Sequence, residues 1–348
     1  MPMKEELLDI IKCPSCSSCS KENFNLLKDE TDSSEIRKGR LECGACRQTF
    51  FIKNGILDLL FKPSKEVLDE TEGIEKAAKD YNPNHNDSML LGLPESAETP
   101  NPLDAVYGYS LNFYKALECL NIAGNEFVLD LGSGNTWSAN KLAQKGCKCV
   151  ALDISVPKFK GLESADVYMK NNGVYYERIV SDMKNLPFID GTFDIVMSNS
   201  SIHHSADLKA VLKEIKRILR EKSRLILINE PVCGIFSLRR GSSRKRLPGF
   251  VAELHWTENI YSIFQYMRYI KKEGFSIKIL HPPSIDKKLA DLSKISPNFK
   301  NKGLKHRLGY LVSFFWGSDI FSAIFRKIMF WPAMVFFGLP LLLIAEKK

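Results

Sequence analysis

Short apolar runs alternate with helical patterns between residues 127 and 231, and this alternation constrains the fold more than any other feature of the sequence. The first run, Phe127–Leu131, ends in Gly132-Ser-Gly134 and is followed by a helical pattern through Gln144. Further runs occupy residues 147–153, 174–180, 193–198 and 224–230, and another helical pattern lies near residues 208–219. Strands that alternate with helices form a parallel sheet whose ligand lies at the carboxyl ends of the strands. The sequence therefore predicts an α/β domain.

Glycines and acidic residues at the ends of these predicted strands indicate a nucleotide-like ligand. Gly132 and Gly134 permit a tight turn and a close approach of the ligand to the backbone, which a Cβ atom would obstruct. Asp153 ends the second strand 23 positions after Asp130, where a carboxylate binds ribose hydroxyls in α/β nucleotide sites. Thr136 stands where the dinucleotide fingerprint has its third glycine, so the sequence disfavours a dehydrogenase.

Two Cys-x-x-Cys pairs, Cys13-Pro-Ser-Cys16 and Cys43-Gly-Ala-Cys46, are separated by 26 residues. They predict a structural zinc ion held by four thiolates, because each pair presents two sulfur atoms to one side and zinc readily accepts thiolates. Such a site would replace the hydrophobic core that about 60 residues cannot build alone. Cys19 could substitute for one of its neighbours, and the alternative is a small domain with unligated thiols.

Alternating apolar residues around both cysteine pairs predict short strands on either side of each turn. With the motifs Cys-Pro-x-Cys and Asn-Gly-Ile, residues 6–60 resemble the zinc-ribbon module of some methyltransferases. That module occurs in bacterial rRNA guanine methyltransferases and as the small activator subunit of several RNA and protein methyltransferases.

A second resemblance rests on four segments that occur in this order: VLDLGSG, ALDIS, SDMKNLPFIDGTFDIVMSNSSIHH and LKEIKRILREKSRLILINEP. From about Glu126 to the carboxyl terminus the chain resembles the class I S-adenosylmethionine methyltransferases, in particular the ubiquinone and menaquinone branch. The resemblance implies a Rossmann-like sheet of seven strands, mostly parallel with the last strand antiparallel, and S-adenosylmethionine as the cofactor. The alternative is a fold of this type that has lost its cofactor.

The resemblance implies cofactor-binding roles for residues at the strand ends. The methionine part of the cofactor would lie against Asp130, Gly132 and Gly134. Asp153 would hold the ribose, while Asp182 and Met183 would bind adenine. The complete implied set is Asp130, Leu131, Gly132, Ser133, Gly134, Asp153, Ile154, Asp182, Met183, Ser198 and Asn199. Two departures from the family pattern, Thr136 for a glycine and Lys222-Ser223 for a Gly-Gly turn, affect loop shape rather than these contacts.

Methyl transfer from a sulfonium mainly requires an acceptor held in line, about 3 Å away, in a dry pocket. A hydroxyl or carbon-acid acceptor also needs a base. His203 and His204 follow the fourth strand at the predicted pocket mouth and are the candidate catalytic residues, although either could be a hydrogen-bonded loop histidine. Weaker candidates are Glu230, Glu253 and His255.

The fourth strand ends in Ser-Asn-Ser-Ser, which disfavours two kinds of nucleic-acid substrate. It lacks the Asn/Asp-Pro-Pro-aromatic clamp for exocyclic amines and the Pro-Cys nucleophile for pyrimidine C5. Ring-nitrogen methylation of guanine in rRNA stays open.

The net charge of +8 is local, because residues 237–310 hold 16 Lys and Arg against 5 Asp and Glu. Their cluster at residues 239–246 could contact phosphates of RNA or of a lipid headgroup, or be a solvated loop.

Residues 328–345 form a run of 18 residues without a charge, which is long enough to suggest a membrane span. Pro332, Gly338 and Pro340 interrupt the run. The class I fold also closes with two antiparallel strands, which residues 275–281 and 339–346 can supply, leaving residues 282–337 as an insertion. Within it, residues 308–337 are predicted to lie on a membrane as an interfacial amphipathic helix or to roof an apolar pocket, with burial in the core as the alternative.

Together these features predict three parts: a zinc ribbon at residues 1–60, linker and lid helices at residues 61–125 that include Tyr81, Tyr107 and Tyr109, and a methyltransferase domain at residues 126–348. We expect a cytoplasmic enzyme, since the start of the sequence lacks a signal-peptide pattern, and peripheral contact with the inner face of a membrane. Its acceptor would be a small or lipid-like molecule. The rivals are an rRNA methyltransferase and a non-catalytic binding or activator protein.

Overall fold

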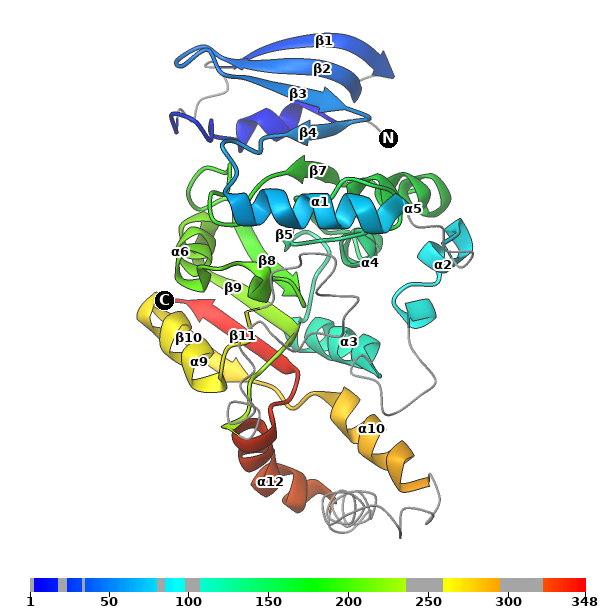
Figure 1. Cartoon of the computed structure of the whole chain (residues 1–348), viewed down its shortest axis with the longest axis vertical. Coiled ribbons are helices and arrows are strands. Elements are labelled where there is room, and N and C mark those ends of the chain that lie inside the picture. Colours follow the sequence, from blue (N-terminus) through cyan, green and yellow to red (C-terminus); the bar gives the residue numbers. More distant parts are fainter. Residues whose placement is uncertain are drawn as a thin grey trace.

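A single sheet of 11 strands runs through the computed structural model of this chain (Figure 1). The structure describes residues 3–17, 24–32, 35–79, 85–97, 107–235, 259–294 and 322–348. The strands are β1 (Phe24–Asp32), β2 (Glu35–Cys43), β3 (Thr49–Lys53), β4 (Ile56–Asp58), β5 (Phe127–Leu131), β6 (Lys148–Asp153), β7 (Glu177–Val180), β8 (Phe193–Asn199), β9 (Leu219–Glu230), β10 (Phe275–Ile279) and β11 (Leu341–Lys347). Their order in the sheet is β1-β2-β3-β4-β7-β6-β5-β8-β9-β11-β10.

Strands β1 to β4 form an antiparallel ribbon, in which the second cysteine pair lies where β2 ends and the turn to β3 begins. The Asn54-Gly55 turn joins β3 to β4, and both residues have positive φ angles of 51° and 71°, as a two-residue hairpin turn of this kind requires. A short 3-10 helix, η1 (Glu5–Asp9), precedes the ribbon and buries Leu7 and Leu8. The predicted strands flank the second cysteine pair as β2 and β3, whereas the segment before the first pair is this 3-10 helix followed by an isolated bridge at Ile11 rather than a strand.

The seven remaining strands have the arrangement that the resemblance implied. Strands β7, β6, β5, β8 and β9 are parallel, and β11 is antiparallel to both β9 and β10. The prediction of a mostly parallel seven-stranded sheet with an antiparallel last strand is confirmed. Residues 275–279 and 341–347 are the closing pair, close to the predicted bounds.

Helices cover both faces of the seven-stranded part. They are α1 (Lys65–Lys79), α2 (Asp87–Leu91), η3 (Glu95–Ala97), α3 (Tyr109–Leu120), α4 (Trp137–Gln144), η4 (Leu162–Ser164), α5 (Ala165–Asn172), η5 (Ile202–His204), α6 (Leu208–Ile218), α9 (Ile263–Lys272), α10 (Pro283–Lys294) and α12 (Ser322–Phe337). Helices α3, α4 and α5 bury apolar residues with Val128, Ile195 and Ile226 on one face. On the other face, α6 and α9 pack in a core that includes Leu129 and Val196.

The ribbon and the seven-stranded part share one sheet and one hydrophobic core. Strand β4 pairs in parallel with β7, with Leu57 opposite Ile179. Before the ribbon, Ile11 is fully buried and forms a bridge with Phe188. The backbone N–H of Ile189 donates to the carbonyl of Ile10 at 2.9 Å. The domain boundary predicted near residue 60 therefore separates two parts of one continuous sheet. The sequence did not indicate that the sheet is continuous.

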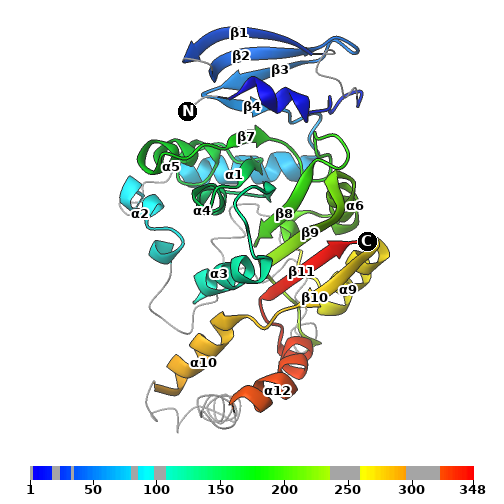
Figure 2. The ribbon, with the colours of Figure 1, turned by 180° about the vertical axis from the view of Figure 1, so that it is seen from behind.

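Helices α10 and α12 lie at the end of the molecule opposite the ribbon in both views (Figures 1 and 2). Helix α12 buries Phe330 and Met334, while Ile328 and Trp331 are exposed by 65% and 43%. The interfacial helix predicted at residues 308–337 lies partly outside the described residues, which begin again at residue 322. Contact of this segment with a membrane stays a prediction. Among the described helices, none has the length and apolar character needed to cross a membrane.

Candidate functional site

Two adjoining cavities lie at the carboxyl ends of the parallel strands. The first, of about 290 Å³, is lined by Asp153, Asp182 and Met183 among others. The second, of about 310 Å³, lies between the turn after β5 and the start of α4. Both cavities are lined by Gly132, Gly134, Lys160 and Ser200, so they meet over the glycine turn.

The predicted cofactor residues are distributed unevenly around these cavities. The lining includes Gly132, Ser133, Gly134, Asp153, Ile154, Asp182, Met183 and Asn199. Asp130, Leu131 and Ser198 are not part of it. Asp130 instead accepts hydrogen bonds from the Ser138 hydroxyl at 2.6 Å and the Ala139 N–H at 3.0 Å. Burial raises the pKa of Asp130 to about 7, and its side chain holds the start of α4 behind the cavity.

Asp153 has free acceptor capacity toward the first cavity. One oxygen accepts the Gly134 N–H at 2.7 Å and the other accepts the Ser155 N–H at 2.8 Å. A carboxylate offers about four lone-pair sites, so two remain for hydroxyl donors of a ligand. Burial raises the pKa of Asp153, while these backbone donors oppose the rise. Asp182 is held similarly, because one of its oxygens accepts the Lys184 N–H at 2.9 Å.

The glycine turn is shaped by contact with the loop that follows β8. Gly132 has a φ angle of +69°, and a Cβ atom there would collide with the Oγ of Ser201. The hydroxyl of Ser201 also donates to the carbonyl of Leu131 at 2.8 Å. Gly132 is thus required both for its backbone conformation and for the room it leaves.

Helix α1 covers the first cavity. Glu66, Val67, Glu70, Ile74 and Ala77 from this helix line it. The Oε1 of Glu70 lies 3.2 Å from Nδ1 of His204 on the far wall, an ion pair when the histidine is protonated. The lid predicted for residues 61–125 rests on Tyr81, Tyr107 and Tyr109, with ordinary packing of these tyrosines as the alternative. Tyr81 lies outside the described residues, and Tyr107 and Tyr109 do not line either cavity. The repeat of Val67, Ile74 and Ala77 along one helical face could have indicated α1.

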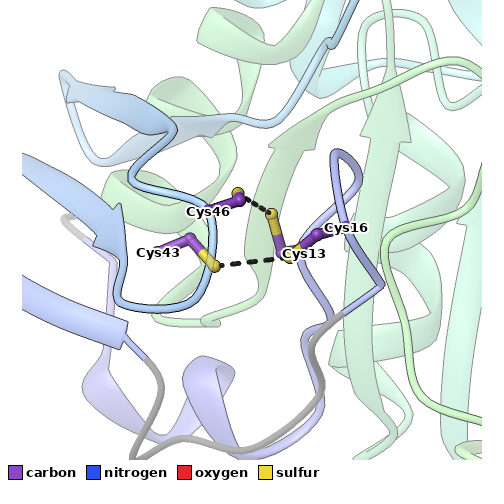
Figure 3. Close-up of side chains that lie close together, drawn as sticks. All are labelled: Cys13, Cys16, Cys43 and Cys46. Carbon is purple, nitrogen blue, oxygen red and sulfur yellow. Dashed lines mark hydrogen bonds between the residues drawn. The ribbon is translucent and has the colours of Figure 1, made fainter.

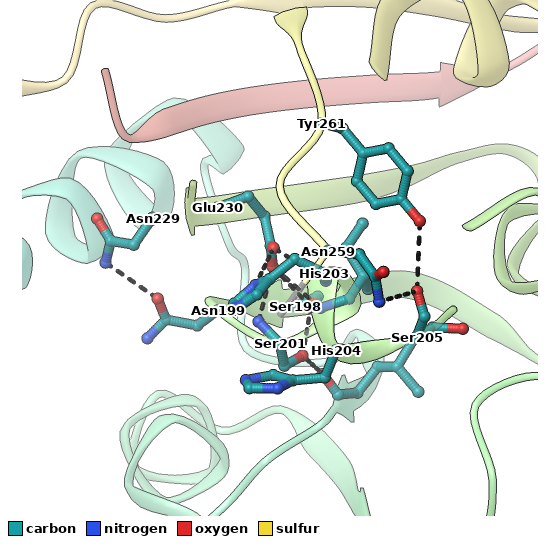
Figure 4. A network of polar contacts seen from close by, with 12 residues as sticks. Ser198, Asn199, Ser201, His203, His204, Ser205, Asn229, Glu230, Asn259 and Tyr261 are labelled. Carbon is teal, nitrogen blue, oxygen red and sulfur yellow. Dashed lines mark hydrogen bonds and ion pairs between the residues drawn. The ribbon is translucent and has the colours of Figure 1, made fainter. Parts of the chain in front are cut away.

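A buried polar network lies beside the cavity where β8 and β9 end (Figure 4). Its centre is Glu230, which is fully buried and lies with one oxygen 2.8 Å from Nδ1 of His203. His203 is itself 4% exposed, whereas His204 lines the first cavity. The two imidazole rings are 4.3 Å apart. Of the two candidate catalytic residues, His204 therefore faces the cavity and His203 lies behind it.

The four cysteines of the two pairs come together at the base of the ribbon (Figure 3). Their sulfur atoms all lie within 4.8 Å of one another, with 3.7 Å between Cys13 and Cys46 and 3.6 Å between Cys16 and Cys43. Tetrahedral zinc with bonds of about 2.3 Å places its sulfur ligands about 3.8 Å apart, so the four thiols fit the ion. Cys19 lies outside the described residues.

Two family models match the sequence. Residues 129–227 match a methyltransferase domain, and residues 4–55 match the Trm112p-like proteins. Together with the sheet described above, the first match identifies a class I S-adenosylmethionine-dependent methyltransferase domain in this chain. The amino-terminal part of the chain is a Trm112-like zinc-ribbon module.

Curated relatives of this methyltransferase act on different acceptors, as their names state. It is 29% identical over 167 residues to demethylmenaquinone methyltransferase of Mycolicibacterium gilvum, covering 47% of this chain and 69% of that protein. It is 38% identical over 106 residues to sarcosine/dimethylglycine N-methyltransferase of Halorhodospira halochloris, covering 29% of this chain and 37% of that protein. A chain of the solved complex between the Haloferax volcanii Trm112 methyltransferase activator and the putative methyltransferase has 16% identity and a TM-score of 0.47, and the match covers 75% of this chain and 97% of that chain.

At its two departures from the usual glycines, the chain has backbone conformations that glycine favours. Thr136 and Lys222 both have positive φ angles, of 63° and 61°. Residues other than glycine reach this region at a cost of about 1 kcal/mol or more, which surrounding contacts must offset. Thr136 is fully buried, and its hydroxyl lies 2.9 Å from the hydroxyl of Tyr176.

Of the other predicted candidates, Glu253, His255 and the basic cluster at 239–246 lie outside the described residues.

Proposed function

We propose that this methyltransferase transfers the methyl group of S-adenosylmethionine to a small or lipid-like acceptor in the space beneath α1. The observation that carries the proposal is the meeting of the two cavities over Gly132 and Gly134. A cofactor that spans both would place its central sulfonium at their junction. The names of the relatives, which include quinone and amino-acid methyltransferases, support an acceptor of this size.

In this proposal the first cavity holds the adenosine part. The two remaining acceptor sites of Asp153 bind the ribose hydroxyls, and Asp182 accepts from the adenine amino group beside Met183. The second cavity holds the methionine part at the start of α4, because the amino terminus of a helix favours a carboxylate. The bound cofactor supplies the activated methyl group. The protein's own residues orient it and exclude water.

The covered, mostly apolar first cavity suits a small or lipid-like acceptor. Val67, Ile74 and Met183 contribute apolar surface to it. If the acceptor is a hydroxyl or a carbon acid, His204 is the residue we propose as the base, because it alone of the two histidines lines the cavity. We also propose that the four clustered thiols hold a structural zinc ion, since a closed set of four ligands leaves no position for a substrate.

Calorimetry with S-adenosylhomocysteine tests the cofactor site. Asp153→Ala removes two charge-assisted hydrogen bonds, each worth about 1.5–3 kcal/mol, so its Kd should rise more than about 100-fold. The control is Asp190→Ala, which removes a carboxylate that is 79% exposed and pairs with Arg217 away from both cavities. Equal affinity of wild type and Asp153→Ala would refute the assignment of the ribose site.

The acceptor class is tested by transfer of a radiolabelled methyl group from S-adenosylmethionine. The probes are a short-chain demethylmenaquinone, sarcosine and purified ribosomal RNA. Label in either small molecule supports the proposal. Label in RNA alone, with a steep dependence on salt, would overturn it in favour of the rRNA rival.

A further inference from the structure

We infer that Glu230 is a positioning residue that holds the loop after β8 in the shape that builds the cofactor site and sets the tautomer of His203. The inference rests on the proposed function, because it assigns a residue that acts on the same cavities without touching the cofactor. Glu230 lies at the carboxyl end of β9 and contacts the loop of Ser201 to His203 across the sheet end (Figure 4).

Three consecutive backbone N–H groups of this loop converge on the Glu230 carboxylate. One oxygen accepts from Ser201 at 2.8 Å and from Ile202 at 3.2 Å, and the other accepts from His203 at 3.3 Å. The side chain of Glu230 is fully buried. A buried carboxylate is stable only when donors satisfy it, and here the donors are the N–H groups of the loop together with the Ser198 hydroxyl at 3.4 Å. The loop and the carboxylate thus depend on each other.

The loop that Glu230 holds is a wall of the cofactor site. The Ser201 hydroxyl bonds to the carbonyl of Leu131 and packs where Gly132 has no Cβ atom. Ser200 lines both cavities, and Ser201 lines the first. A displacement of Ser201 would therefore move the glycine turn over which the two cavities meet.

Glu230 also determines which nitrogen of His203 carries the hydrogen. Its oxygens act as acceptors toward the loop, so Nδ1 of His203, at 2.8 Å, is the donor in this pair. The His203 ring lies beside that of His204, which lines the first cavity and pairs with Glu70 of α1. The position of His204 thus depends on Glu230 through the neighbouring ring and the shared loop.

The test is Glu230→Gln. The amide oxygen can still accept from Ser201 and Ile202, but the NH₂ group cannot accept from His203. His203 should therefore switch to the tautomer with hydrogen on Nε2, which imidazole ¹⁵N NMR detects, with the signals assigned by His203→Gln. We expect the Kd of S-adenosylhomocysteine to rise about tenfold, because one of the loop's N–H groups loses its acceptor.

The matched control is Glu126→Gln. Glu126 also accepts three consecutive backbone N–H groups, those of Ala123, Gly124 and Asn125, but it does so just before β5, at the opposite end of the strands. This control should leave both the His203 tautomer and the affinity unchanged. The same His203 tautomer in wild type and Glu230→Gln, with an affinity equal to that of the control, would overturn the inference.

A second variant keeps the inference testable if Glu230→Gln does not fold. Ser201→Ala removes the hydroxyl that reaches Leu131 but keeps the N–H that reaches Glu230. It should weaken S-adenosylhomocysteine binding several-fold and leave the His203 tautomer unchanged. An affinity of Ser201→Ala equal to that of wild type would refute the inferred link between the loop and the glycine turn through the Ser201 hydroxyl. Failure of wild type to bind S-adenosylhomocysteine at all would instead overturn the proposed function, while the tautomer measurement would still report on Glu230.

Discussion

Ile11→Ala tests whether the ribbon and the catalytic part unfold as one unit. Ile11 is fully buried and bridges to Phe188, in the core that both parts share. Truncation of a buried isoleucine to alanine costs about 2–5 kcal/mol, through lost transfer energy and the cavity left behind. At about 2.1 cal/mol/K per residue, the unfolding entropy of 348 residues converts this into a Tm about 3–7 °C lower.

Two measurements during thermal unfolding report separately on the ribbon and on the catalytic part. Zinc release, followed with a chromogenic chelator, reports on the ribbon, and loss of S-adenosylhomocysteine binding reports on the catalytic part. In Ile11→Ala both should shift together and by the same amount. Leu27→Ala is the control, because Leu27 is 43% exposed on β1 and its loss should cost less than about 0.5 kcal/mol. Early zinc release with wild-type stability of ligand binding would refute the shared core.

Three further changes have distinct expected outcomes. Cys43→Ser should release the zinc, as measured by atomic absorption, and weaken S-adenosylhomocysteine binding, because the backbone of Lys12, next to Cys13, bonds to Pro187, in the segment that follows Asp182. Glu70→Gln should speed cofactor dissociation in stopped-flow experiments, since it removes the carboxylate through which α1 contacts Nδ1 of His204 at 3.2 Å. Gly132→Ala should abolish binding in calorimetry, because the added methyl group collides with Ser201.

Each of these changes has a control in the same chain. Cys119→Ser alters a cysteine that is not in the cluster and should keep the zinc. Glu72→Gln alters an exposed carboxyl of α1 and should leave the dissociation rate unchanged. Gly191→Ala adds a methyl group at a similar φ angle, +62°, where nothing lies within 4 Å, so it measures backbone strain alone. Loss of binding in Gly191→Ala as well would show that strain, rather than the collision, explains the effect at Gly132.

Features that depend on local sequence could be predicted before the structure was known. The strand ending at Leu131, the glycine turn and the carboxylate at Asp153 follow from patterns a few residues long. The pairing of β4 with β7 could not be predicted, because it joins residues about 120 positions apart and β4 has only three residues. The positioning role inferred for Glu230 could not be predicted either, because a single acidic residue at the end of a strand does not indicate which backbone N–H groups will donate to it.

The segment that covers the site could not be identified from aromatic residues. Tyr107 and Tyr109 were predicted to form a lid because aromatic residues stood out in a polar stretch, but neither lines a cavity. Helix α1 covers the site although only Val67, Gly73 and Ala77 are buried along it. The apolar residues Val67, Ile74 and Ala77 share one face of this helix, so the spacing of apolar residues, rather than the presence of aromatic ones, was the informative signal.

The continuous sheet has a consequence for solubility and for truncation experiments. Unpaired edge strands are templates for aggregation, and proteins protect them with charged side chains. Within the described part of the chain the sheet ends at β1, which carries Lys28, Asp29 and Glu30, and at β10, which carries Lys278. Strand β7 has the apolar sequence Ile179-Val180 at its end and is protected by β4 instead. A catalytic fragment that begins after residue 60 would expose this edge and should self-associate.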